Sequence, residues 1–128
     1  MWGHSYEFES ADNWNVIEEF CEYIDTLDSE YMVANLDIGH VGLAMRDDEA
    51  DDFIRALGHD RLKALHVHDN NYQTDSHILP YFGSINWDKI TSALADIDYD
   101  GDFTYEVNAW LQCFSTLLPL SRTYFTRV

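Results

Sequence analysis

The sequence predicts an α/β fold in which helices alternate with parallel strands. Three short segments rich in apolar residues, 31–38, 62–67 and 102–107, are read as the strands. The first shows no polar–apolar alternation, which is typical of a strand covered on both faces. Segments with apolar residues at helical spacing separate the strands. This regular alternation favours parallel strands joined by right-handed crossovers.

The expected helices follow from the same periodicity. Residues 12–27, 47–57, 87–97 and 109–125 place apolar side chains at helical spacing, and Pro119 is expected to kink or break the last of them. Gly58 ends the second helix as a C-cap, and residues 39–42 are expected to form a loop. The polar stretch 68–86 is longer than most connections in a compact domain, and loops of that length are usually functional.

Composition limits the classes of function. The chain has 128 residues with 46% hydrophobic content, enough for one domain with a sizeable core. Its formal net charge of −17, with only 7 lysines and arginines, argues against nucleic-acid binding, which depends on cations that neutralise phosphates. The acidity is explained by solubility or by attraction of divalent cations.

Cysteine usage and hydropathy suggest a compartment. Cys21 and Cys113 lie far apart in segments that are read as helices, so two free thiols in a reducing compartment are expected. The sequence shows no charged-then-apolar leader at Met1 and no apolar run long enough to cross a bilayer. We therefore expect a cytoplasmic protein without a membrane partner.

Three side chains suited to metal binding stand where the predicted strands end: Asp37, His66 and Glu106. In parallel sheets, ligands collect at the carboxyl ends of the strands, so these groups are expected to lie close together. Two carboxylates and an imidazole are suitable ligands for a divalent metal. The alternatives are that Asp37 only caps the following loop and that His66 is a core imidazole with satisfied hydrogen bonds.

Several motifs resemble the sugar phosphate isomerase/epimerase family of xylose isomerase-like barrels. They are Leu-Asp-Ile-Gly-His at 36–40, His-Val-His-Asp-Asn at 66–70, Asp-Ser-His at 75–77, Gly-Ser-Ile-Asn-Trp at 83–87, and the stretch from Tyr-Asp-Gly to Tyr-Glu at 99–106. Their order matches that of the family. Tyr81 and Phe82 depart from it, because the family has a glycine ahead of Gly83, and this alters the loop over the substrate pocket.

The resemblance implies a (β/α)8 TIM barrel, which needs about 250 residues. Residues 1–128 are therefore expected to be a single domain fragment, the C-terminal half of such a barrel. Its strands would be the sixth to eighth, or the fifth, sixth and eighth with the seventh within residues 70–85. A fourth ligand of the family, a glutamate, falls around or before Met1, so Met1 is expected to be an internal methionine of a longer gene.

The resemblance also assigns roles to residues. Asp37, His66 and Glu106 would bind Mn, Mg, Co or Zn, and Glu106 would also transfer the substrate's proton. His40 would hydrogen-bond a substrate oxygen, unless it is a loop histidine that faces solvent.

Four further residues stand near these motifs. Asp75 and His77 would line the substrate pocket or, as in the related apurinic endonuclease branch, hold additional zinc ions. His68 is expected either to support a metal ligand from behind or to lie exposed. Asp69 is expected to orient a ligand.

The function that the resemblance implies is isomerisation or epimerisation of a sugar or sugar phosphate through an enediolate. The alternatives are a lyase of the inosose-dehydratase type, an apurinic endonuclease relative, which the charge of −17 opposes, and a catalytically incomplete fragment. An open half-barrel leaves strand edges and apolar faces uncovered, so association with a second copy or with a missing N-terminal half is expected.

Overall fold

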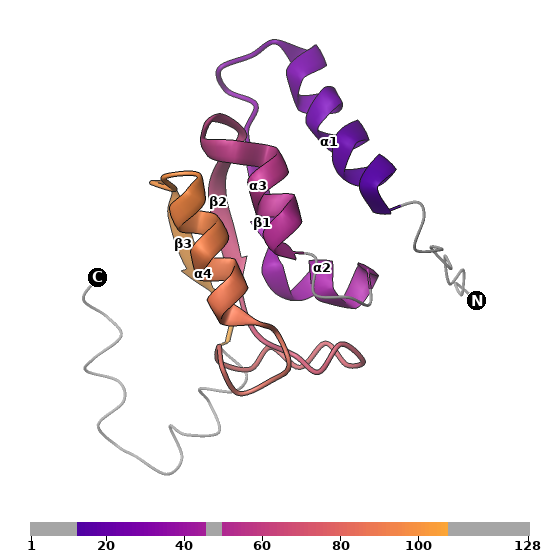
Figure 1. The fold of residues 1–128 in the computed structure, drawn as a ribbon, viewed down its shortest axis with the longest axis vertical. Helices are drawn as coiled ribbons and strands as arrows, with labels where there is room; N and C mark the ends of the chain where they lie inside the picture. The colour runs from indigo at the N-terminus through magenta and orange to yellow at the C-terminus, as the bar shows by residue number, and fades with distance from the viewer. Residues whose placement is uncertain (1–12, 46–49, 108–128) are drawn as a thin grey trace.

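The computed structural model describes residues 13–45 and 50–107 of the chain. The described part contains one sheet of three strands in the order β1-β2-β3, with both neighbouring pairs parallel. The strands are β1 (Ala34–Asp37), β2 (Leu62–Val67) and β3 (Asp102–Tyr105). Helices lie against one side of this sheet, and the sheet does not close on itself (Figure 1). The predicted class, a partial barrel of parallel strands alternating with helices, is confirmed.

The long helices build the layer beside the sheet. They are α1 (Asn13–Leu27), α3 (Ala50–Arg61) and α4 (Trp87–Asp96). Helix α3 lies between α1 and α4 (Figure 1), and the rings of Phe20 and Phe53 join α1 to α3 edge to face, with centroids 5.8 Å apart. The side chains buried between helices and sheet include Ile54, Leu57, Leu62, Leu65 and Ile90.

Most predicted boundaries agree closely with the structure. The second strand was predicted as 62–67 and is observed there, and α4 ends one residue before the predicted limit. The first strand is shorter than predicted, since it begins at Ala34. Gly58 adopts a φ of 67°, which glycine favours, and its non-helical backbone divides α3 into two helical segments, so the first segment ends at Gly58 as predicted. The predicted helix at 109–125 and Cys113 lie outside the described residues.

The loop predicted at residues 39–42 is wrong, because these residues belong to helix α2 (Ile38–Met45). Its glycines suggest a loop, but they are needed for packing. A Cβ on Gly39 would lie 2.1 Å from the His68 ring, and one on Gly42 would lie 2.8 Å from the Tyr72 ring. Asp37 accepts a hydrogen bond from the His40 N–H at 2.9 Å and so satisfies a free donor at the start of the helix.

Residues 70–85 do not contain a barrel strand. Their only strand-like pairing in the described part of the chain is an isolated antiparallel bridge between Asp69 and Ile78. Strands β2 and β3 are direct neighbours, so no strand lies between them. The expectation of a hidden seventh strand in this stretch is therefore wrong, and the three strands are consecutive.

Strand β3 lies at the edge of the sheet, and all four of its residues are exposed, including Phe103 and Tyr105.

Cys21 is a free, partly buried thiol in α1. Within the described ranges, none of the helices is both long and apolar enough to span a membrane.

Candidate metal centre

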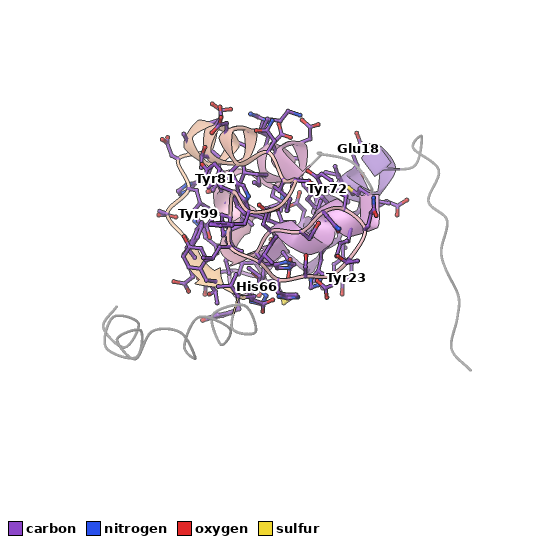
Figure 2. All side chains as sticks on the ribbon, turned by 90° about the horizontal axis from the view of Figure 1, so that it is seen from below. Glu18, Tyr23, His66, Tyr72, Tyr81 and Tyr99 are labelled. Atoms are coloured by element: carbon purple, nitrogen blue, oxygen red, sulfur yellow. The ribbon has the colours of Figure 1, made fainter. Side chains whose placement is uncertain are left out.

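The parallel register brings the predicted ligands to one edge of the sheet. Asp37 is the last residue of β1 and pairs with His66 of β2, and the N–H of Glu106, directly after β3, donates to the Val67 carbonyl at 3.0 Å. Figure 2 is seen from below in the frame of Figure 1, onto the ends to which the strands point, with His66 labelled. Three separate segments thus deliver their side chains to the same place.

His66 lies close to both of the other two side chains. His66 Nδ1 lies 2.9 Å from Glu106 Oε1 and 3.8 Å from Asp37 Oδ2. All three are partly exposed: 19% of the Asp37 side chain, 31% of Glu106 and 36% of His66 are accessible. The structure therefore brings together the three groups that the sequence analysis selected as metal ligands.

His68 forms the buried floor of this site. The residue is 0% exposed, and its Nε2 lies 3.1 Å from Asp37 Oδ1. The direction of that contact is poor for a hydrogen bond, and neither ring nitrogen has a well-aligned partner in the part of the chain that the structure describes. One ligand atom each of Asp37, His68 and Glu106 lie within 4.8 Å of one another. The exposed position considered for His68 is wrong, and the contact behind Asp37 is observed.

A second group of side chains forms the rim. His40 Nδ1 lies 2.7 Å from Asp37 Oδ2, and its Nε2 lies 3.3 Å from Asp75 Oδ1. His77 Nε2 lies 3.0 Å from the same Asp75 oxygen, and His77 Nδ1 donates to the Glu106 carbonyl at 2.7 Å. The His77 ring stacks on the His68 ring with centroids 3.8 Å apart. The rim and the three predicted ligands therefore form one continuous cluster.

The charge state of the cluster follows from these contacts. Partial burial opposes ionisation of Asp37, but the close contact with the His68 ring and the hydrogen bond from the His40 backbone, together with attraction to both rings, outweigh it and lower its pKa to about 2. Burial likewise opposes the charge on His40, yet Asp37 and Asp75 raise its pKa. The pKa of Asp75 is lowered, because the nearby histidines outweigh the effect of burial. Asp37 and Asp75 are therefore anionic at neutral pH.

The donor set fits a divalent cation. Carboxylate oxygens suit hard ions such as Mg²⁺ and Mn²⁺, and imidazole nitrogens suit Zn²⁺ and Co²⁺. His40, His68, Asp75 and His77 also offer one ligand atom each within 4.8 Å of one another. The same rim atoms are suited to hydrogen-bond the hydroxyl groups of a polar ligand.

The expectation that Asp69 orients a ligand is wrong. Its buried carboxylate accepts hydrogen bonds from the Gly83 and Ile85 N–H groups and from the Trp87 indole. These donors belong to the end of the long loop and the start of α4 rather than to the metal centre. No signal in the sequence links Asp69 to partners 14 to 18 residues away.

Comparison with known proteins identifies the family. The family model described as xylose isomerase-like TIM barrel matches residues 5–113, which is most of the chain. The chain belongs to this family. The resemblance that its motifs suggested is therefore confirmed.

The relatives found by sequence comparison include a protein named for an activity. The D-psicose 3-epimerase of Enterocloster bolteae is 33% identical over 87 residues, which cover 68% of this chain and 26% of the epimerase. An uncharacterized protein of Methanocaldococcus jannaschii is 32% identical over 91 residues, 70% of this chain and 30% of that protein.

A solved structure, of a D-tagatose 3-epimerase-like protein, shares the fold with a TM-score of 0.60. It is 24% identical, and the match covers 80% of this chain and 42% of the solved one. The chain thus spans less than half the length of each of these proteins.

Proposed function

We propose that this chain carries part of the active site of a divalent-metal-dependent isomerase or epimerase that acts on a sugar or sugar phosphate. The observation that supports the proposal is the convergence of Asp37, His66 and Glu106 at the carboxyl edge of the sheet, with His66 Nδ1 near both carboxylates. The similarity to a protein named D-psicose 3-epimerase supports the reaction class.

Asp37, His66 and Glu106 would hold the cation, and His68 would hold Asp37 from the buried side through its contact at 3.1 Å. A bound divalent ion supplies Lewis-acid polarisation of the substrate's carbonyl and neighbouring hydroxyl oxygens, which acidifies the adjacent C–H group. The ion's role is thus to stabilise negative charge, and the protein's role is to place the groups that move the proton.

Glu106 is the proposed proton-transfer group. Its carboxylate lies at the open end of β3, where it contacts His66 at 2.9 Å. A carboxylate within hydrogen-bond reach of the substrate removes the proton next to the carbonyl group and leaves an enediolate. Return of a proton to the opposite face of that carbon gives epimerisation, and return to the former carbonyl carbon gives isomerisation.

His40, Asp75 and His77 are proposed to bind the substrate. They line the rim beside the ligands and hold one another through Asp75 Oδ1. A polyhydroxylated substrate offers both donors and acceptors, which suits a rim of imidazole nitrogens and a carboxylate. The strands that the longer relatives have in addition are proposed to complete the pocket, from an N-terminal half or from a second copy.

Solvent deuterium exchange tests the proposal. The full chain would be incubated with Mn²⁺ and ketohexoses of the psicose and tagatose type in D2O, and deuterium next to the carbonyl carbon would be followed by NMR. We expect incorporation that depends on the cation and falls about 10²- to 10⁴-fold in Glu106→Gln. Incorporation that is equal in wild type, Glu106→Gln and metal-free samples would contradict the proposal.

A further inference from the structure

The loop of residues 70–85 must be held in one shape for its side chains to act. It carries Asp75 and His77, which contact His40 and the Glu106 carbonyl at the metal centre. The loop contains no helix or strand of its own. Fixing such a segment costs backbone entropy at every residue, so strong contacts elsewhere must offset that cost.

Those contacts converge on one carboxylate, that of Asp69, which is 0% exposed. Its Oδ1 accepts the N–H groups of Asn70 at 2.8 Å and Ile85 at 3.2 Å. Its Oδ2 accepts the N–H of Gly83 at 3.0 Å and the indole N–H of Trp87 at 2.8 Å. The carboxylate therefore ties the first residue of the loop to its last residues and to the start of α4.

Backbone and neighbouring contacts support the same closure. The Asp69 backbone exchanges hydrogen bonds with Ile78 at 2.7 and 3.1 Å, next to His77. The Asn70 side chain donates to the Gly39 carbonyl at 2.8 Å, and so joins the loop to α2 beside the metal centre. A Cβ on Gly83 would lie 2.3 Å from Asp69 Oδ1, which shows how closely the loop wraps around the carboxylate.

We propose that Asp69 is a positioning residue, whose carboxylate closes the 70–85 loop so that Asp75 and His77 face the metal centre. Both oxygens already accept two hydrogen bonds each, so the carboxylate has no role in contact with a cation or substrate. It acts through the loop. Its consequence for substrate binding rests on the proposed function, whereas its effect on loop structure does not.

The variant Asp69→Asn tests the chemistry with almost no change in shape. The amide has one acceptor oxygen, so in either orientation its NH2 group faces two N–H donors and two hydrogen bonds are lost. We expect amide exchange to accelerate about tenfold or more at Ile85 if the NH2 group takes the place of Oδ1, or at Gly83 if it takes the place of Oδ2, because that N–H then loses its acceptor. In the second case the Trp87 indole N–H signal should shift and lose protection together with Gly83.

The matched control is Asp51→Asn, which alters another buried carboxylate, in α3, whose side chain binds Arg55. It should leave the exchange rates of Gly83 and Ile85 unchanged. If Asp69→Asn does not fold, Trp87→Phe removes a single donor to Asp69 while keeping an aromatic ring, and the same amides should exchange faster. Exchange rates in Asp69→Asn and Trp87→Phe equal to those of Asp51→Asn would overturn the proposal.

Two functional measurements separate positioning from general stability. Asp69→Asn should raise KM for the sugar as His77→Ala does, and the double variant should be no worse than the single ones, since both act through the same loop. Affinity for Mn²⁺ should stay within about threefold of wild type. Cation affinity lost together with loop protection would overturn the loop-specific role. If wild type shows no turnover, the exchange measurements alone decide the proposal, and only the proposed function fails.

Discussion

Asp37 and Asp69 are two aspartates at the ends of neighbouring strands, and their surroundings differ. Asp37 ends β1, keeps 19% of its side chain exposed and faces three imidazole rings. Asp69 follows β2, is fully buried and accepts four N–H donors from backbone and indole. Imidazole nitrogens can act as acids, bases and metal ligands near neutral pH, whereas backbone N–H groups only donate hydrogen bonds. The hydrogen-bonding partners of a strand-end carboxylate, rather than its position, therefore decide whether it is available to bind a metal or instead fixes the backbone.

The largest effect is expected from removing the open carboxylate. Asp37→Asn should weaken Mn²⁺ binding at least about 100-fold. Mutating a residue that only hydrogen-bonds a metal ligand already lowers metal affinity about 10- to 100-fold, and removing a ligand should cost at least as much. Calorimetric titration of the full chain measures this. Asp60→Asn, at the exposed end of α3, is the control for loss of one surface charge. Equal affinities in the two variants would remove the distinction drawn between Asp37 and Asp69.

One glycine packs closely against each region, Gly39 near the metal centre and Gly83 near Asp69, and substituting them tests whether the two regions act separately. Gly39→Ala places a methyl group 2.1 Å from the His68 ring, and Gly83→Ala places one 2.3 Å from Asp69 Oδ1. Each should lower the free energy of unfolding by about 1–3 kcal/mol, as overpacked sites do. Only Gly39→Ala should also weaken Mn²⁺ binding, since His68 lies behind Asp37. Urea denaturation with and without Mn²⁺ distinguishes them, and an equal loss of cation affinity would contradict the separation of the two regions.

The low pKa of Asp37 predicts a stability change in acid. In chelator-treated protein its folded pKa is about 2, against an ordinary value of 3.8. A depressed carboxyl pKa contributes stability above the unfolded pKa, and that contribution is lost as pH falls from about 4 to about 2. The contribution is at most about 2 kcal/mol. Denaturation of wild type and Asp37→Asn at pH 6 and pH 2 measures it; an unchanged difference between the two would contradict the assignment.

The smallest effect is expected at Gly58, which is remote from both regions in its packing. Its φ of 67° is unfavourable for other residues, but among the described residues no atom lies within 4 Å of an added Cβ. Gly58→Ala should therefore cost about 1 kcal/mol through backbone conformation alone and leave Mn²⁺ affinity unchanged. Thermal denaturation measures the loss of stability, and titration measures the Mn²⁺ affinity. A change in affinity would show that the conformation of α3 affects the metal centre and would contradict this prediction.

Local sequence patterns predicted the scaffold well. The apolar run Leu62–Val67 and the periodic helix Trp87–Asp96 were placed within one residue, because their patterns are uninterrupted. Helix α2 was missed, since Gly39 and Gly42 suggest flexibility when read alone and reveal their packing role only beside His68 and Tyr72.

Contacts between distant residues set the remaining features. The proximity of Asp37, His66 and Glu106 could be predicted, because side chains at the carboxyl ends of neighbouring parallel strands generally lie at the same edge of the sheet. The burial of His68 and the four donors to Asp69 depend on how the 70–85 loop returns to the sheet. No local pattern encodes that return path, so the partners of Asp69 were predicted wrongly.

Asp37, His66 and Glu106 are proposed to bind one divalent cation together. Electron paramagnetic resonance of the full chain titrated with Mn²⁺, with detection of ¹⁴N coupling, tests it most directly. We expect one saturable ion with an imidazole nitrogen coupling that disappears in His66→Ala and persists in the surface-charge control Asp60→Asn. Mn²⁺ that binds only in proportion to the protein's negative charge, with no nitrogen coupling, would contradict it.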